Sequence, residues 1–404
     1  MAVAEEVVGG PLPIAARKQM CLPTRLAGLQ WQCIADTLPL ARAANLLETG
    51  PHLRAALRAW WPEIAEAEVR VLDGRAHSQE LLGQLDSMGI RPGPQGLPAE
   101  ASVPDPLGSP CPSRHLQSAF LAHRAEIIYK ELQREGTERD RVRLLSAGGA
   151  TSGSSLVSTT ETGTSDTQWR QALRWRLRLP GRAGRCRNIP SQGGDACDEV
   201  LTEHGDHALA CMTGPVRQAV HAEFADIVCE FIEEAGGHAR REAFVREFRS
   251  RRQAGQQPTR READKEAFLD VWGWGSAEIP ELLVYVTWRH PMASRYLPGA
   301  SPTAGHACQL AAEDKETRYP ASGGRAVHTF CVEGWGRLGA AGEAVLDMLA
   351  GAAAIHDRRR GRAAPSRLQR WRARVDGAFQ RGLARALEAA RYGLPGRPAG
   401  RRCR

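Results

Sequence analysis

Apolar positions between residues 215 and 355 recur first at helical spacing and then at strand spacing, and this change predicts the order of elements. A helix is predicted by apolar residues three or four positions apart: Val216, Val220, Phe224, Ile227 and Phe231. Pro215 suits its first turn, and Gly236 with Gly237 suits its end. We therefore expect one amphipathic helix to open this stretch.

Short apolar runs follow this helix and predict a small sheet. Strands are expected at 238–248, 267–272 and 281–288, then a helix at 307–319, a strand at 326–332 and a helix at 340–355. The run ELLVYVTW at 281–288 is the most apolar, which is typical of a central strand. The predicted fold class is α/β, of the mixed α+β kind, and one fold with this order of elements houses metal-dependent nucleases.

Few residues in this stretch could carry chemistry. Asp270 lies within the apolar run FLDVW, where a carboxylate is costly to bury without a partner or a metal ion. Lys315 follows on the predicted helix at 307–319, and Arg318 lies one turn further on the same face. One interpretation is phosphodiester hydrolysis, in which Asp270 holds Mg²⁺ or Mn²⁺ and Lys315 offsets charge on the phosphate. The other is an acid at a strand end and a solvated lysine.

A second group of residues has the composition of a metal site: Cys186, Cys197, His207 and Cys211. Thiolate and imidazole ligands suit tetrahedral Zn²⁺, and a histidine and a cysteine four positions apart share one face of a helix. His204 is an alternative to His207, and Cys186 precedes Cys197 by more residues than is usual in a zinc knuckle. Buried reduced cysteines beside a surface histidine are the other interpretation.

Three stretches carry a likeness to a known family: CDEVLTEHGDHALAC, then FLDVWGWG with LLVYVTWRHP, then AAEDKETRYP with VEGWGRLG. Over about half of the chain, from Cys186 to Leu394, they resemble the C-terminal region of reverse transcriptases from non-LTR retrotransposons. In that region of the family a Cys-Cys-His-Cys zinc knuckle precedes a restriction-like endonuclease of the PD-(D/E)XK type. The resemblance implies structural zinc bound through His207, and DNA nicking by Asp270 and Lys315 that exposes a 3′-hydroxyl for priming.

Tyr285 departs from the family pattern, which usually has an acid at this position. A neutral phenol is a poor ligand for a hard divalent cation. Glu281 shares its strand face but lies ~13 Å away at the rise of a strand. Glu242, Asp264 and Glu333 are other acids of the predicted core, and a structural hydrogen bond to the Gly-Trp turn is expected for Glu333. The runner-up function is a non-catalytic nucleic-acid-binding relic, and a fragment without cellular function is the third.

The N-terminal part of the chain resembles the same family at one turn. CLPTRLAGL, at 21–29, is similar to the segment that follows the polymerase thumb, with Ala27 where a glycine is usual. Helices are expected at 31–47 and 52–72. The chain has no adjacent pair of aspartates of the kind that marks a polymerase palm, so the resemblance implies a reverse transcriptase supplied in trans.

Six segments are predicted: a helical region at 1–91, a linker at 92–112, a helix and a mobile Ser/Thr/Gly-rich loop at 113–168, a basic helix and zinc knuckle at 169–213, the nuclease-like core at 214–355 and a basic helix and tail at 356–404. The arginines at 169–179 are either phosphate contacts or a solvated face. The apolar stripe from Leu368 to Leu387 predicts a helix that docks on the core and presents arginines to nucleic acid, or to an anionic membrane.

The charge balance favours DNA or RNA as the partner. The chain has 54 Lys and Arg against 46 Asp and Glu, with an isoelectric point near 9.1. Arg289, His290 and Arg318 are candidate contacts to the phosphate backbone. No signal peptide and no membrane-spanning apolar run is recognised, and Arg358–Arg360 could serve nuclear import, so we expect an intracellular protein in the nucleus.

Overall fold

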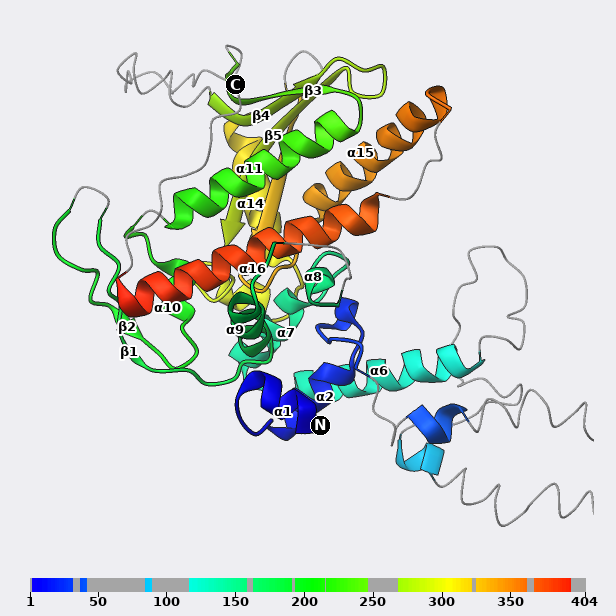
Figure 1. The fold of residues 1–404 in the computed structure, drawn as a ribbon, viewed down its shortest axis with the longest axis vertical. Coiled ribbons are helices and arrows are strands. Elements are labelled where there is room, and N and C mark those ends of the chain that lie inside the picture. The colour runs from blue at the N-terminus through cyan, green and yellow to red at the C-terminus, as the bar shows by residue number, and fades with distance from the viewer. Residues whose placement is uncertain are drawn as a thin grey trace, which may run out of the picture. The chain divides into compact units, whose positions relative to one another are not determined.

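The computed structural model describes residues 2–31, 37–41, 84–88, 116–157, 163–190, 193–214, 216–245, 268–321, 325–361 and 367–393. These residues form a mixed α/β fold in which helices flank one small sheet, as the sequence predicts (Figure 1). The chain divides into two compact units. One comprises Met1–Arg17, Thr24–Leu29 and Gly136–Arg404, and the other Lys18–Pro23 and Gln30–Glu135. The knuckle segment, the sheet and the C-terminal helix, predicted as separate segments, therefore belong to one unit.

The sheet has four strands in the order β3 (His238–Phe244), β4 (Phe268–Trp274), β5 (Glu281–Arg289) and β6 (Val327–Glu333). The first three strands are antiparallel, and β5 pairs with β6 in parallel, with Tyr285 opposite Thr329. Because β5 is internal and pairs on both edges, most of its side chains are buried, which explains its continuous apolar run. The predicted central strand is confirmed.

Helices pack on the sheet in the predicted order. α11 (Val216–Glu234) precedes β3, α13 (Leu297–Ala300) and α14 (His306–Arg318) connect β5 to β6, and α15 (Ala340–Arg359) follows β6. α11 lies across β3, β4 and β5 and buries Val220, Phe224 and Phe231, which belong to the apolar face read from the sequence (Figure 1). α14 and α15 both pack against β6.

The C-terminal helix α16 (Leu368–Tyr392) docks on the core, and five of its arginines pair with carboxylates. Trp371, Val375 and Phe379 are fully buried, and Trp371 stacks on Phe231 of α11 with ring centroids 4.6 Å apart. The ion pairs join α16 to α11 and α15: Arg374 with Glu230 and Glu234, Arg370 with Glu234, Arg381 and Arg385 with Glu223, and Arg372 with Glu343. Carboxylates within the fold therefore offset much of the positive charge that the sequence suggests for nucleic acid.

The Ser/Thr/Gly-rich stretch 147–168 is largely ordered, contrary to the predicted mobile loop. Thr151 and Ser152 are fully buried, and the short helix α8 (Ser154–Val157) follows them. The buried Asp376 of α16 accepts hydrogen bonds from the backbone N–H of Gly153 at 3.0 Å and from that of Ser155 at 2.9 Å. The small side chains of this stretch predict a mobile loop, yet in the structure its backbone N–H groups approach α16 closely enough to donate to Asp376.

The next helix, α9 (Asp166–Arg176), begins at Asp166, before the predicted start at Trp169, with Ser165 as its N-cap. Its Arg176 is 2% exposed and donates to Ser152 Oγ at 2.9 Å and to the carbonyls of Gly28 and Thr24 at 3.3 Å. Burial lowers the pKa of Arg176 to about 10. Both sequence interpretations, a phosphate contact or a solvated side chain, are wrong for this arginine.

The remaining described helices are α1 (Ala2–Val8), α2 (Ile14–Cys21), η1 (Thr24–Leu26), α6 (Leu116–Glu135) and α7 (Glu138–Ala147). At the turn after η1, Ala27 is buried with φ of 70°, a left-handed conformation that glycine adopts at lower cost. This explains why a glycine suits the position. The predicted helix at 52–72 and the linker at 92–112 lie outside the described residues, as does most of 31–47.

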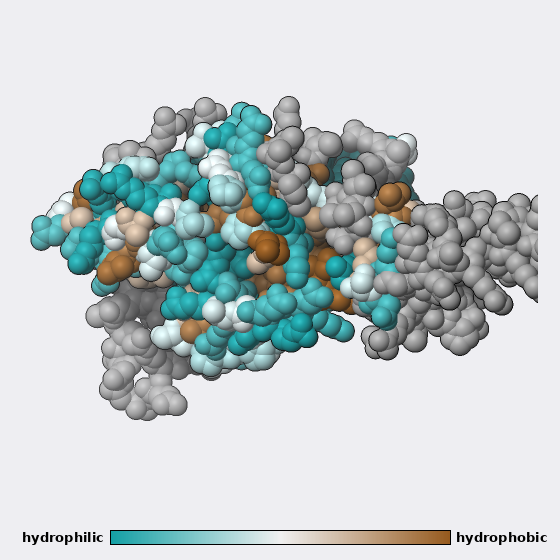
Figure 2. All heavy atoms as spheres, turned by 90° about the horizontal axis from the view of Figure 1, so that it is seen from below, coloured by the Kyte–Doolittle hydropathy of each residue, from teal (hydrophilic) through white to brown (hydrophobic). Residues whose placement is uncertain are grey.

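One face of the described surface is largely polar (Figure 2). Figure 2 shows one face on which hydrophilic side chains cover most of the described surface, with hydrophobic side chains in separate patches. Among the described helices, none is long and apolar enough to cross a membrane.

The buried carboxylate of Asp376 should be essential to stability. Asp376→Ala leaves two backbone N–H groups, the Ser155 hydroxyl and the Gln380 side-chain amide without their acceptor, and it removes the negative charge near the buried Arg176. We therefore expect a loss of ~3–5 kcal/mol in the free energy of unfolding. Arg385→Ala removes a half-exposed ion pair with Glu223 and should cost less than ~1 kcal/mol. Urea unfolding measures both, and equal losses would contradict the assignment.

Candidate functional site

Two short strands and one helix bring the four predicted metal ligands together. Strand β1 (Gly184–Arg185) pairs antiparallel with β2 (Val200–Leu201), and α10 (Asp206–Ala210) follows. Cys186 comes directly after β1, where its N–H donates to the Glu199 carbonyl at 2.8 Å. The N–H of Cys197 donates to the Asn188 carbonyl, also at 2.8 Å, which folds the intervening loop back. The spacing between Cys186 and Cys197, which is longer than usual in a zinc knuckle, is thus accommodated by a hairpin.

The ligand atoms of Cys186, Cys197, His207 and Cys211 all lie within 4.8 Å of one another, so this cluster could hold a metal ion. Cys186 Sγ and Cys211 Sγ are 3.8 Å apart, and Cys197 Sγ lies 3.4 Å from His207 Nε2. Zn–S bonds of ~2.3 Å and Zn–N bonds of ~2.0 Å place ligands of a tetrahedron ~3.5–3.8 Å apart, so the donor set fits zinc. His204 is not in the cluster and instead lies 3.5 Å from Glu203.

Asp270 lies on β4 just beyond the last residue that pairs with β5 through the backbone. The paired residues run from Trp274 with Glu281 to Val271 with Val284. Beyond them, the carboxylate of Asp270 accepts a hydrogen bond from the Val286 N–H at 2.7 Å. Its other oxygen lies 3.3 Å from Nε2 of His221, which α11 supplies. Asp270 is therefore held by two neighbours.

Lys315 approaches the same point from α14. Its ammonium lies 3.4 Å from the ring centroid of Tyr285, a cation–π contact at the position where the family pattern has an acid. Burial, followed by the charges of Arg318 and Arg289, lowers the pKa of Lys315 to about 8. Burial, followed by the charge of Asp270, raises the pKa of Tyr285, so the phenol is neutral at pH 7. The structure thus brings Asp270, Tyr285 and Lys315 together.

This donor set does not fit Mg²⁺ or Mn²⁺. These ions need several oxygen ligands, and here a single carboxylate is already engaged by the Val286 N–H and His221, with the charge of Lys315 nearby. In the described part of the chain, the knuckle quartet is the one group of three or more His, Cys, Asp or Glu side chains placed to hold a metal. We therefore derive no metal-assisted step at Asp270.

The other acids considered as ligands have different surroundings. Glu281 pairs with Arg325 at 2.9 Å, and Glu242 is exposed on β3 with φ of 51°. Glu333 is 1% exposed and accepts a hydrogen bond from the N–H of Ala307 at 3.1 Å. Its side chain therefore serves the start of α14 and not the Gly-Trp turn expected from the sequence. Asp264 lies outside the described residues.

A cleft of about 1050 Å³ lies between the knuckle, α11 and β5. Its walls include Met212 and Thr213 from the knuckle, Arg217 and His221 from α11, and Tyr285, Thr287 and Arg289 from β5. No carboxylate is among the described side chains that line it. This composition makes the cleft suitable for an anion.

Arg217 and Arg289 differ from the arginines of α16 because no described carboxylate pairs with either. Nη1 of Arg289 donates to Thr287 Oγ1 at 2.7 Å and to the Trp288 carbonyl at 3.2 Å, while its Nε has no partner among the described residues. Burial, followed by the charge of Arg289, lowers the pKa of Arg217. Two guanidinium groups thus repel each other at the cleft wall, and an anion would offset this cost.

The predicted backbone contacts at Arg289, His290 and Arg318 have separate outcomes. Arg289 lines the cleft, and Arg318 is exposed beside Tyr319, 5.5 Å from that ring. His290 is only 8% exposed and lies beside Trp335, with ring centroids 5.2 Å apart. Burial lowers the pKa of His290 to about 3, so it is neutral. The expectation that His290 is a surface contact to phosphate is therefore wrong.

Sequence reasoning missed Arg217 and His221. They lie four positions apart on α11, on the side that faces the cleft rather than the apolar face. A search for basic residues at helical spacing just after Cys211 would have found them.

Comparisons with protein-family models, with curated proteins and with solved structures found no match to this chain. The functional assignment therefore depends on the geometry described above and on the resemblance in sequence.

The metal cluster makes a direct prediction about zinc content. We expect one zinc ion per chain in protein purified without chelator, and loss of that ion in His207→Ala. His204→Ala is the matched control, since this histidine is outside the cluster, and it should keep its zinc. Elemental analysis measures the metal, and thermal unfolding should show a lower midpoint in His207→Ala alone. Zinc loss in both variants or in neither would refute the ligand set.

Proposed function

We propose that this protein binds nucleic acid along the cleft between the zinc knuckle and the sheet, and that its nuclease-like core is not catalytic. The observation that carries the proposal is the pair Arg217 and Arg289, which lack carboxylate partners in the described structure and face an acid-free cleft. Arginine binds phosphate through several parallel N–H groups. A phosphodiester backbone would supply the missing negative charge along the length of the cleft.

The knuckle has a structural role in this proposal. Zinc bound by Cys186, Cys197, His207 and Cys211 would hold β1, β2 and α10 together, and with them one wall of the cleft. Burial, with a smaller contribution from Cys211, raises the pKa of the Cys186 thiol to about 12. A bound cation offsets that cost, because thiolates are the ligands of zinc.

The absence of catalysis follows from the charges around Asp270. Lys315 occupies the space over Tyr285, and Arg289 adds a second positive charge near Lys315. A divalent cation would be repelled there and would find too few oxygen ligands. The same positive charges favour binding of phosphate without cleaving it.

A metal-dependent endonuclease that nicks DNA remains the second candidate function. The convergence of Asp270 on β4 and Lys315 on α14 favours it, since the topology brings together two residues that the family resemblance assigns to catalysis. In either case the partner is DNA or RNA, and a reverse transcriptase would be supplied in trans. Arg358–Arg360 at the end of α15 would support location in the nucleus.

The arginine pair should dominate binding. Arg217→Ala and Arg289→Ala should each weaken binding to a short DNA about three- to tenfold near 0.1 M salt and reduce the salt slope by about one. Arg385→Ala is the matched control, because this arginine already pairs with Glu223 at 3.0 Å. Fluorescence anisotropy at several salt concentrations measures both quantities for DNA and RNA. A control variant that loses as much affinity as the other two would contradict the proposal.

Nicking of supercoiled plasmid with Mg²⁺ or Mn²⁺ separates the two candidate functions. We expect neither the native chain nor Asp270→Ala to nick, because the ligand set around Asp270 is incomplete. Activity of the native chain that Asp270→Ala abolishes would establish the endonuclease instead. Activity in Tyr285→Asp alone would identify a nuclease scaffold that has lost its second acid.

A further inference from the structure

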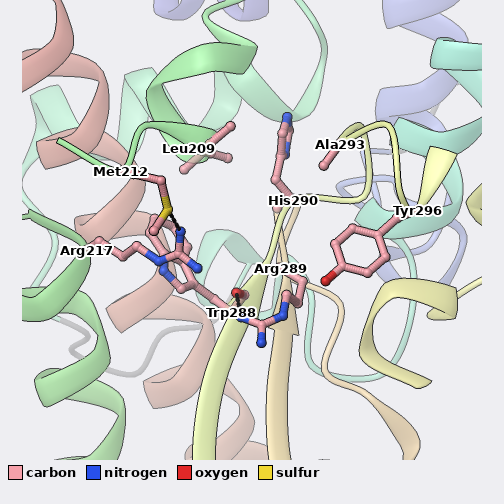
Figure 3. Close-up of a pocket in the computed structure, with 10 residues that line it drawn as sticks. Leu209, Met212, Arg217, Trp288, Arg289, His290, Ala293 and Tyr296 are labelled. Atoms are coloured by element: carbon pink, nitrogen blue, oxygen red, sulfur yellow. Dashed lines mark hydrogen bonds between the residues drawn. The ribbon is translucent and has the colours of Figure 1, made fainter. Parts of the chain in front are cut away.

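A smaller pocket next to the cleft has features that binding to a phosphate backbone leaves unexplained. Its volume is about 340 Å³, near the lower end of the ~300–1,000 Å³ range of small-ligand pockets. Figure 3 shows Arg217 and Met212 on one side of it and Tyr296 on the other, with Trp288, Arg289 and His290 completing the wall. The lining is mainly aromatic and apolar, whereas a phosphate alone needs only donors.

His290 is a buried side chain of this pocket whose two ring nitrogens both lack a partner among the described residues. Neither Nδ1 nor Nε2 has a hydrogen-bond partner among the described residues, although the side chain is only 8% exposed. Unsatisfied buried nitrogens are uncommon because each costs free energy. Since burial keeps the ring neutral, one nitrogen can donate and the other can accept. A ligand that offers both an acceptor and a donor would suit it.

Gly334 leaves room for the imidazole of His290 to pack against the backbone. A Cβ atom at this glycine would lie 2.5 Å from Nδ1 of His290, so any other residue would displace the imidazole. The neighbouring Trp335 stacks on Trp175 with centroids 5.2 Å apart, and Trp175 Nε1 donates to the Gly334 carbonyl at 3.0 Å. The imidazole is therefore held in place by rigid neighbours.

The pocket and the cleft share part of their walls. Met212, Arg217, Trp288 and Arg289 line both. The two unpaired arginines are thus positioned where a ligand in the pocket would continue into the cleft. An isolated aromatic molecule could fill the pocket, but a ligand attached to a chain of phosphates would use both spaces and both arginines.

We infer that the smaller pocket takes a single nucleobase turned out of a bound strand, with the adjoining phosphate on Arg217 and Arg289. The face of the base lies against Trp288 or Tyr296, and its polar edge satisfies His290. This inference rests on the proposed function and adds that the protein reads one unstacked nucleotide. Because an extruded base must first leave its stack, single strands bind better than duplexes.

The test maps where a base lies. A single-stranded oligonucleotide with one central 5-iodouracil is bound to the full chain, irradiated and digested, and the adduct is located by mass spectrometry. The expected adduct is on Trp288, Tyr296 or His290. Binding with adducts only on other residues would overturn the inference and leave the proposed function standing. A native chain that binds neither single strands nor duplexes would overturn both.

A pocket-filling variant provides the second measurement. Ala293→Phe places an aromatic ring in the pocket and leaves both arginines in place. It should lose the adduct and bind the single strand about tenfold more weakly, as expected for the loss of one stacked base, while duplex affinity stays within about twofold. Ala15→Phe, at an exposed position of α2, is the matched control and should behave as the native chain. An unchanged adduct yield in a folded Ala293→Phe variant would refute the pocket assignment. If that variant does not fold, the positions of the adducts in the native chain test the assignment on their own.

Discussion

The packing of α16 against α11 is the contact on which most of this structure depends. The helix buries Trp371, Val375 and Phe379, and its Asp376 binds the backbone of the segment around Gly153. The same helix also contacts α8, α9 and α10, so it links the sheet core, the Ser/Thr-rich segment and the knuckle in one compact unit. Of the two sides of the cleft, the knuckle contacts α16 directly through β1 and α10, and β5 is joined to α16 through α11.

Two classes of arginine can be distinguished once the helices are in place. Those of α16 meet Glu223, Glu230 and Glu234 of α11, and the resulting pairs neutralise much of the charge that the composition suggests. Arg217 and Arg289 have no such partners in the described structure and lie on the cleft wall. The positions of Arg217 and Arg289 on the cleft wall therefore say more about binding than the excess of basic residues in the composition does.

Periodicity predicted the sheet and its helices because each element buries one face, and the apolar spacing records that face. It could not show that 147–157 is packed, since the acceptor for Gly153 and Ser155 is Asp376, more than 200 residues away. Sequence also indicated the metal quartet and the approach of Lys315 to Asp270. It did not reveal the cleft, which depends on how the knuckle lies against β5. Glu223, Glu230 and Glu234 of α11 are spaced seven and four positions apart, which places them on one face of that helix. This spacing could not be assigned to pairing with the arginines of α16 until the structure showed that the two helices pack together.

The neutralisation of α16 has a consequence for kinetics. Long-range attraction between a protein and a polyanion depends on uncompensated charge, and it raises the rate of encounter most at low ionic strength. A helix whose guanidinium groups are matched by carboxylates within ion-pair distance contributes little to such a field beyond about one Debye length of ~8–10 Å. The proposed binding of nucleic acid would therefore depend on short-range contacts in the cleft, and ligands would differ in their dissociation rates more than in their association rates.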